Sequence, residues 1–274
     1  MSNFITNDQP KNLLKRLQQL IAVSEELKFL VGFFYFSGIK ELYESLLQNS
    51  QLKLNILVGL NVDIVNYQLV ECTDASDKNL SNAGIAGRFF QSIKNSINND
   101  EFDTEEFYKQ ITFFKQLIKN GNCIIRKTIK PNHAKLYIFK LKQGQVKRSL
   151  FITGSSNLTR AGLVDQSEFN VEISDYGIEE AEKYFDDLWN KAVKITEDEV
   201  RKQQLISILE NDTFIKEITP FEAYCLVVKT YLDSYEAVTI GDYLCKILDK
   251  NGYTPYRYQL DAVSQALSII QKHN

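Results

Sequence analysis

The sequence contains few of the side chains that build metal sites and disulfides. Among its 274 residues are four cysteines and two histidines, His133 and His273. The cysteines lie far apart and form no CxxC pair, which argues against metal-ligand spacing and against a disulfide framework; they are Cys72, Cys123, Cys225 and Cys245. We therefore expect a reduced, cytoplasmic protein with no metal site and no other resident cofactor.

Long apolar runs are also missing. No run reaches the ~18 residues that cross a bilayer, and the N-terminal stretch MSNFITNDQPKN lacks the basic start and apolar stretch of a secretory signal. The sequence gives no reason to expect a membrane partner.

One long segment lacks acidic residues altogether. From Phe107 to Val164 there is no Asp or Glu but there are 12 Lys and Arg residues, whereas the rest of the chain carries 20 basic residues and all 35 acidic ones. Such a split is typical of a region whose positive field attracts a polyanion such as DNA or RNA. The alternative is a basic face that packs against acidic helices of the same fold.

Hydrophobic patterning predicts one α/β domain over residues 1–195. The apolar run 29–38, the helical pattern 39–48 and the apolar run 52–60 follow one another as strand, helix and strand, which favours a right-handed βαβ unit and a mostly parallel central sheet. Flanking helices are expected at residues 11–28, 178–193 and, within a polar and largely helical stretch from 61 to 122, at 107–120. Further strands are expected at residues 123–129, 134–140, 148–154 and 168–174.

The rest of the chain differs in character and is helix-prone. Residues 196–250, with Pro220 at a helix start, are interpreted as a small helical accessory region or linker, and residues 251–274 begin another helix.

Five polar side chains are expected to converge at neighbouring strand ends. His133 and Lys135 lie two residues apart at the head of one strand, Ser155 and Asn157 lie two apart after the next, and Glu168 opens the last strand, so each pair can share a face. A neutral imidazole is a nucleophile toward phosphorus near pH 7, and lysine, serine and asparagine can stabilise charge on phosphate oxygens. Glu168 could hold the second ring nitrogen and fix its tautomer. This set of groups suits phosphodiester cleavage.

The same residues resemble the signature of the phospholipase D-like superfamily, H-x-K-x4-D followed by G-S-x-N. Here it reads His133-Ala-Lys135, four residues, Lys140, and then Gly154-Ser155-Ser156-Asn157. Lys140 stands where the family has Asp, and metal-independent nucleases of the family tolerate that loss. Glu168 follows Asn157 at an interval of eleven residues, which favours Glu168 over its rival Glu172 on the same strand face.

The resemblance implies a two-histidine mechanism in which one imidazole forms a phosphohistidine and the other protonates the leaving oxygen. The chain has one interior copy of the motif, so two chains must meet to form a shared site, and we expect a homodimer. We predict a metal-independent DNA endonuclease, with RNA not excluded, whose substrate backbone is contacted by Arg126, Lys127, Lys130 and Arg160. The alternatives are a catalytically silent nucleic-acid-binding module and a lipid phosphodiesterase.

A second resemblance lies in the tail, YTPYRYQLDAVSQAL. It is similar to the segment that precedes the ATP-binding loop in superfamily-two (Swi/Snf-type) helicases, where a glutamine at the position of Gln259 contacts adenine. The chain has no G-x-x-x-x-G-K-[ST] loop, so ATP would be a cofactor only of an attached motor. We therefore expect the N-terminal part of a restriction or defence helicase, in which residues 251–274 begin the motor; an ordinary closing helix is the alternative.

Overall fold

The computed structural model describes residues 4–7, 12–33, 36–65, 68–72, 80–97 and 105–211, together with scattered positions between 221 and 266. The chain divides into two compact units after Lys216, whereas the sequence suggested a boundary near residue 195. Within the described ranges, no helix has both the length and the apolar character of a membrane span.

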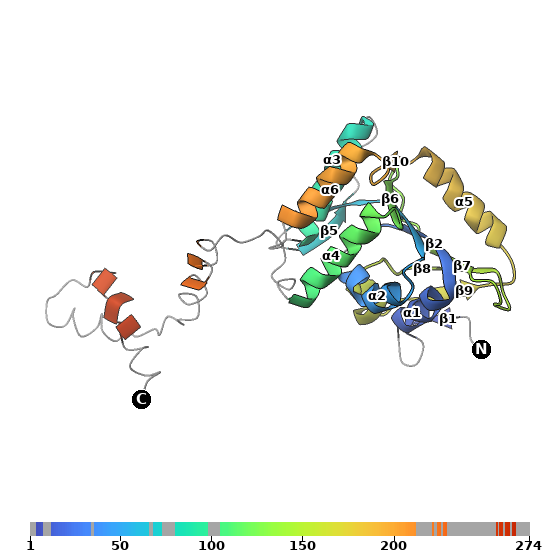
Figure 1. Ribbon diagram of the computed structural model, residues 1–274, viewed down its shortest axis with the longest axis horizontal. Helices are drawn as coiled ribbons and strands as arrows, with labels where there is room; N and C mark the ends of the chain where they lie inside the picture. Colours follow the sequence, from blue (N-terminus) through green and yellow to red (C-terminus); the bar gives the residue numbers. More distant parts are fainter. Residues whose placement is uncertain are drawn as a thin grey trace. The chain divides into compact units, whose positions relative to one another are not determined.

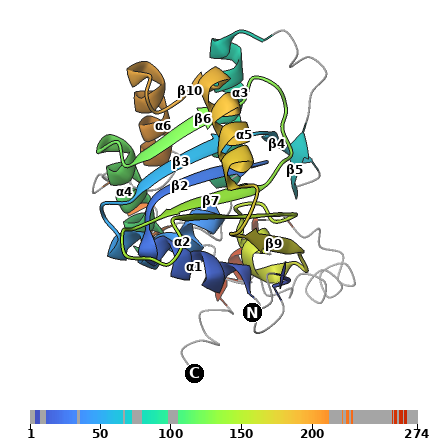
Figure 2. The same ribbon diagram turned by 90° about the vertical axis from the view of Figure 1, so that its right-hand side faces the viewer.

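The first unit is an α/β fold built on a central eight-stranded sheet (Figures 1 and 2). Along the sheet the strands are ordered β1-β9-β8-β7-β2-β3-β6-β10. In chain order they span β1 Phe4–Ile5, β2 Ser24–Val31, β3 Lys53–Val58, β6 Cys123–Lys127, β7 Leu136–Leu141, β8 Ser149–Gly154, β9 Asn170–Ile173 and β10 Val193–Lys194. The expected α/β architecture with a helix-flanked sheet is confirmed.

The strand directions differ from the expectation of a mostly parallel sheet. Only β2–β3 and β3–β6 pair in parallel, and the other five neighbouring pairs are antiparallel. The parallel pairs follow helical crossovers, whereas β7, β8 and β9 follow one another through connections that contain no crossover helix across the sheet, which suits antiparallel pairing. The sheet is therefore mixed.

Helices cover both faces of the sheet. They are α1 Leu13–Val23, α2 Phe36–Gln48, α3 Asn82–Ile97, α4 Glu105–Lys119, α5 Ile178–Lys191 and α6 Glu199–Asn211. Helix α5 lies across one face, in front of the strands in Figure 2, where Phe185 packs on a small core with Leu30 and Ile138. The larger core on the other face joins the sheet to α1, α2, α3, α4 and α6, and it includes Leu205 and Leu209 of α6. This packing of α6 places it in the first unit.

Helix α1 ends, and strand β2 begins, five residues earlier than the sequence predicted. Ser24 starts β2 because its hydroxyl donates to Leu20 O at 2.7 Å, and the buried Asn49 carboxamide donates to Ile21 O and Ser24 O at 2.8 Å each. These bonds give side-chain donors to carbonyls at the end of the helix and the start of the strand. Residues 25, 26 and 28 are charged but belong to the strand. Because charged residues are unusual in a buried strand, the sequence pattern placed the start of the strand too late.

The region between residues 61 and 122 was expected to be helical but begins with a hairpin. Strands β4 Asn61–Val65 and β5 Gln68–Cys72 pair antiparallel and form a separate two-stranded sheet. Helices α3 and α4 follow, and α4 confirms the predicted helix there. The alternating pattern of the short sequence NVDIV favours a strand over a helix, although the surrounding polar residues obscured it.

Candidate active site

His133 and Lys135 lie side by side just before strand β7. The His133 side chain is exposed, whereas Lys135 is only 4% exposed. The Lys135 Nζ atom lies 2.7 Å from His133 Nδ1 and 3.2 Å from Nε2. A lysine ammonium can only donate, so this contact requires an unprotonated ring nitrogen as the acceptor.

Asn157 reaches the same place from the loop that follows β8. Its Oδ1 atom accepts a hydrogen bond from Gly32 N at 3.1 Å, at the end of β2. A Cβ atom added to Gly32 would lie 2.9 Å from Asn157 Oδ1 and 3.6 Å from Lys135 Nζ. The imidazole, the ammonium and the carboxamide therefore lie together at the ends of β2, β7 and β8.

Two side chains that the sequence did not single out as catalytic hold the loop after β8. The Tyr137 hydroxyl donates to Ser156 O at 2.8 Å, and Asn170 Nδ2 donates to Ser156 Oγ at 2.9 Å. Burial raises the pKa of Tyr137, and the charge of Glu168 raises it further, so this phenol stays a donor. The sequence patterns did not indicate Asn170 or the backbone of Gly32, because their partners come from distant strands.

Glu168 and Ser155 form the outer part of the site. The Ser155 hydroxyl donates to the Glu168 carboxylate and accepts from Phe169 N at 3.1 Å. The rival carboxylate, Glu172, instead accepts from Arg16 Nε at 2.5 Å and from Nη2 at 2.8 Å. This hydrogen bond raises the pKa of Arg16, against the lowering effect of burial. In the structure Glu168 is in contact with Ser155, and its role in orienting the His133 imidazole stays a prediction.

Gly59 packs closely against Asn132, the residue that precedes His133. A Cβ atom on Gly59 would lie 1.9 Å from Asn132 O, and Asn132 N donates to Gly59 O at 3.1 Å. The same carbonyl accepts from Lys127 Nζ at 3.1 Å and from the Thr128 hydroxyl at 3.2 Å. The absence of a side chain at Gly59 thus lets the loop carrying His133 lie against the end of β3.

We predict that Gly59→Ala lowers the free energy of unfolding by about 3 kcal/mol and reduces turnover, because the added methyl displaces Asn132 and the loop beside it. Urea unfolding and turnover per folded molecule measure the two effects. Gly87→Ala is the matched control, since its Cβ meets nothing within 4 Å on helix α3, and it should stabilise by about 0.5–1 kcal/mol. Equal urea midpoints for the two variants would contradict this account of Gly59.

Lys140, which stands where the resembling family has Asp, lies at the opposite end of β7 from His133. Its Nζ atom is 3.0 Å from Glu26 Oε2, directly across from it on β2. Burial lowers the pKa of Lys140, but the hydrogen bond and charge of Glu26 outweigh burial and leave the pKa raised. The pair therefore contributes to stability at neutral pH, and that contribution is lost only as the pH rises through the raised value. Lys140 is part of a structural ion pair.

We predict that Lys140→Asp destabilises the fold by about 1 kcal/mol, because two carboxylates then face each other across β2 and β7. Lys140→Met, which removes the charge without adding a like one, should cost less. Thermal melts and turnover per folded molecule measure both variants. A rise in turnover for Lys140→Asp would show that the family Asp can act on the chemistry here.

The four cationic residues predicted to contact nucleic acid have different surroundings. Arg126 is buried, with Nε 2.5 Å from Glu197 Oε2 and its guanidinium 4.4 Å from the centre of the Trp189 ring. Lys127 is also buried, Lys130 is exposed three residues before His133, and Arg160 is 3.4 Å from Asp165. Of these four, Lys130 and Arg160 are exposed and Arg126 and Lys127 are buried, and a contact of any of them with nucleic acid stays a prediction.

Much of the acid-free segment is paired within the fold. Among the described residues, six of its twelve cations form ion pairs with carboxylates of other segments; they are Lys115, Lys119, Arg126, Lys140, Lys147 and Arg160. Lys147 lowers the pKa of Asp175 through a hydrogen bond and its charge. The basic residues of this segment therefore form ion pairs that stabilise the fold, in addition to carrying positive charge on the surface.

Two further sequence expectations concern metals and the tail. Across the described ranges, no three His, Cys, Asp or Glu side chains cluster in a way that could hold a metal ion. In the second unit, Gln259 N donates to Tyr256 O at 2.9 Å, and the rings of Tyr256 and Tyr258 stack with centroids 5.9 Å apart. The predicted contact of Gln259 with adenine stays a prediction.

Comparison with known proteins gives one family match and several structural likenesses. The family described as "Cardiolipin synthase, PLD-like domain" matches residues 29–189. No curated protein matches the chain. Among solved structures, NucT from Helicobacter pylori has 13% identity and a TM-score of 0.39, covering 70% of this chain and 96% of its own. Nuc from Salmonella typhimurium, titled a phospholipase D family member, has 13% identity and a TM-score of 0.35, with 70% and 95% covered. Phosphatidylserine synthase from Haemophilus influenzae Rd KW20 has 16% identity and a TM-score of 0.42, with 82% and 46% covered.

Proposed function

Because the chain belongs to the phospholipase D-like domain family, we propose that it is a phosphodiesterase, and specifically a DNA endonuclease that needs no metal ion. One observation carries the proposal: the imidazole of His133 lies 2.7 Å from the ammonium of Lys135, at the point where Asn157 also converges. A nucleophile and two groups suited to binding phosphate oxygens thus lie together at the ends of neighbouring strands.

In the proposed first step, the lone pair of a His133 ring nitrogen attacks phosphorus and forms a P–N bond. The bond from phosphorus to the leaving oxygen breaks, and that oxygen takes a proton from the imidazolium of His133 in a second copy of the chain. In the second step, water attacks the phosphohistidine, its proton passes to the second imidazole, and the P–N bond breaks. Lys135 and Asn157 hold the non-bridging oxygens throughout.

The two-step scheme requires two imidazoles and so requires a homodimer with a shared site. His133 is the one histidine in the matched region, and its exposed side chain is accessible to a second chain. Glu168, with Ser155, is proposed to orient the imidazole when the site is complete. A two-fold axis passing beside His133 would supply each site with both rings.

DNA is favoured as the substrate over a lipid, with RNA the nearest alternative. Lys130 and Arg160 are exposed close in sequence to His133 and Asn157, where they can contact neighbouring phosphates. The aromatic–arginine–aromatic–glutamine segment at 256–259 supports a further proposal, that this nuclease works beside an ATP-driven restriction or defence motor. The same basic side chains would also serve a module that binds nucleic acid without cutting it.

We predict that the purified chain cleaves DNA in excess EDTA and leaves a choline lipid intact. The reason is that the proposed nucleophile and the charge-stabilising groups all come from side chains. Gel assays of plasmid and oligonucleotide cleavage, run beside release of choline from vesicles, measure both reactions. Loss of cleavage on chelation would contradict the metal-free mechanism, lipid turnover without DNA cleavage would favour the lipid phosphodiesterase, and salt-sensitive DNA binding without cleavage would favour the silent module.

A further inference from the structure

Two exposed phenylalanine rings lie beside the outer part of the site. The rings of Phe4 and Phe169 are 50% and 57% exposed, and their centroids are 5.4 Å apart with an angle of 31° between the ring planes. Phe4 on β1 lies opposite Val171 on β9, so the two rings are diagonal neighbours on one face of this strand pair. Single exposed apolar side chains are common, whereas two aromatic rings in contact form a continuous apolar surface.

The backbone of Phe169 is fixed to the site through Ser155. Phe169 O accepts from Ser155 N at 3.2 Å, and Phe169 N donates to the Ser155 hydroxyl at 3.1 Å. Alternation along the strand places Phe169, Val171 and Ile173 on one face of the sheet. Ile173 packs against the small core beneath α5, whereas Phe169, at the other end of the strand, is more than half exposed. The rings are therefore held at the end of β9 that lies next to Ser155.

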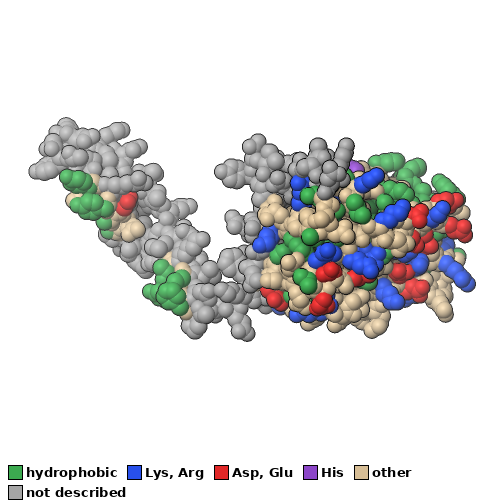
Figure 3. All heavy atoms as spheres, turned by 90° about the horizontal axis from the view of Figure 1, so that it is seen from above, with side chains coloured by type: hydrophobic (Ala, Val, Ile, Leu, Met, Phe, Trp, Pro, Cys, Tyr) green, Lys and Arg blue, Asp and Glu red, His purple; other side chains and the backbone are tan. Residues whose placement is uncertain are grey.

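The strand order sets the distance between the rings and Lys135. Lys135 directly precedes β7 and Phe169 directly precedes β9, and these strands run in the same direction because each pairs antiparallel with β8. Both residues thus lie at the same edge of the sheet, two strand spacings or about 10 Å apart. On the face seen in Figure 3, hydrophobic side chains gather at the surface beside the histidine, which is purple. This distance is on the scale of a single nucleotide.

The exposed area of the two rings fits the face of a nucleobase better than it fits a second protein chain. A phenylalanine side chain can bury ~150–250 Å², so the exposed halves of the two rings present roughly 200 Å². A stable interface between two chains buries about 800 Å² on each partner. Every nucleobase has a flat π-face that stacks on an aromatic ring, so a base is the occupant that the area favours.

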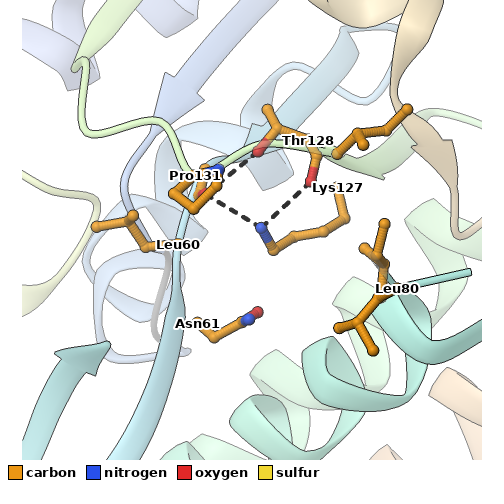
Figure 4. A pocket seen from close by; sticks show the side chains of 9 residues that line it. Leu60, Asn61, Leu80, Lys127, Thr128 and Pro131 are labelled. Atoms are coloured by element: carbon orange, nitrogen blue, oxygen red, sulfur yellow. Dashed lines mark hydrogen bonds between the residues drawn. The ribbon is translucent and has the colours of Figure 1, made fainter. Parts of the chain in front are cut away.

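The hollow on the other side of the His133 site is too small for a base. It lies between Asn61, Lys127 and Leu80, near the ends of β3 and β6 (Figure 4). The space there holds about one water molecule. A base that flanks the scissile phosphate therefore finds room on the exposed rings and not in this hollow.

We propose that Phe4 and Phe169 form a stacking platform for one base of the substrate strand, next to the scissile phosphate. This inference rests on the proposed function and deepens it by naming the substrate class, which is single-stranded or locally unpaired DNA. A base that is paired and stacked within a duplex has no free face to offer the rings. Stacking reads no hydrogen-bonding edge, so the platform accepts all four bases.

The test compares two single-stranded probes of equal length, a thymidine oligonucleotide and a chain of the same sugars and phosphates without bases. Both carry the same charge, so the ratio of their Kd values reports the bases alone. In the full chain carrying His133→Ala, which keeps the probes uncut, fluorescence anisotropy should show the thymidine probe binding about tenfold more tightly. Phe169→Leu should bring this ratio close to one, and Phe169→Trp should retain it. Tyr176→Leu, at an exposed ring beyond the far end of β9, is the matched control and should also retain it.

The Kd for the base-free probe should stay the same in every variant, and a change in Phe169→Leu would make Phe169 structural. Equal Kd values for the two probes, a ratio that survives Phe169→Leu, or a duplex that competes as well as the single strand would overturn the platform. Sedimentation should show an unchanged oligomeric state in Phe169→Leu, and a dimer that dissociates would assign the rings to contact between copies of the chain. Base-dependent binding without DNA cleavage would refute only the proposed function, and cleavage that ignores Phe169 would refute only the platform.

Discussion

His133→Ala is expected to lower the rate of phosphodiester cleavage by about 10⁴-fold while leaving the fold intact. The change removes the proposed nucleophile and, in a dimer, the proposed general acid as well, and each role contributes orders of magnitude. Because the His133 side chain is exposed, its loss should change the free energy of unfolding by no more than about 0.5 kcal/mol. Single-turnover cleavage in EDTA and a thermal melt measure the two quantities.

The control for this variant is His273→Ala, which changes the other histidine of the chain and should cleave at the wild-type rate. Mixing denatured wild-type and His133→Ala subunits in equal amounts and refolding them tests the shared site. If both rings are needed, only wild-type homodimers are active, and activity falls to about a quarter of the wild-type value. Activity of one half would mean that each chain works alone, and an active His133→Ala protein would refute the mechanism itself.

The sequence predicted those features of the fold that depend on local apolar patterning. The runs at 52–60, 123–129 and 148–154 become β3, β6 and β8, and the pattern at 178–193 becomes α5. What it could not predict depends on contacts between distant segments. Strand β2 starts at Ser24 because Asn49, from the end of α2, satisfies carbonyls there, and no local pattern records that contact. The direction of β7 is likewise decided by its neighbours.

The site shows the same division between local and distant information. The H-x-K and G-S-x-N spacings led to the prediction that the side chains of His133, Lys135 and Asn157 lie close together. The reason is that residues two apart in an extended chain share a face, and the ends of neighbouring strands lie side by side. They were not sufficient to show that Lys140 pairs with Glu26 at the far end of β7. A count of charges was misleading for Arg126, whose guanidinium is held by Glu197, because the count ignores what each cation faces.

Lys135→Met is the second change expected to have a large effect, with a fall of about 10³-fold in kcat/KM. Lys135 supplies a buried positive charge beside the point where the phosphate would sit, and such preorganised charge is worth about 3–4 kcal/mol. Methionine keeps the aliphatic part of the side chain, so the packing around Tyr137 and Leu136 should persist. Steady-state kinetics on an oligonucleotide and a urea titration measure both effects.

Binding of inorganic phosphate separates the role of Lys135 from that of His133. If Lys135 holds the phosphate, the Kd for phosphate should rise about tenfold or more in Lys135→Met but change little in His133→Ala, whose imidazole reacts with phosphorus instead of carrying fixed charge. Lys135→Arg keeps the charge but replaces a compact ammonium with a planar fork, so it should recover part of the binding and little of the turnover. Unchanged phosphate affinity in Lys135→Met would mean that the 2.7 Å contact with His133 Nδ1 serves to position the ring, and that the charge for the phosphate comes from another side chain.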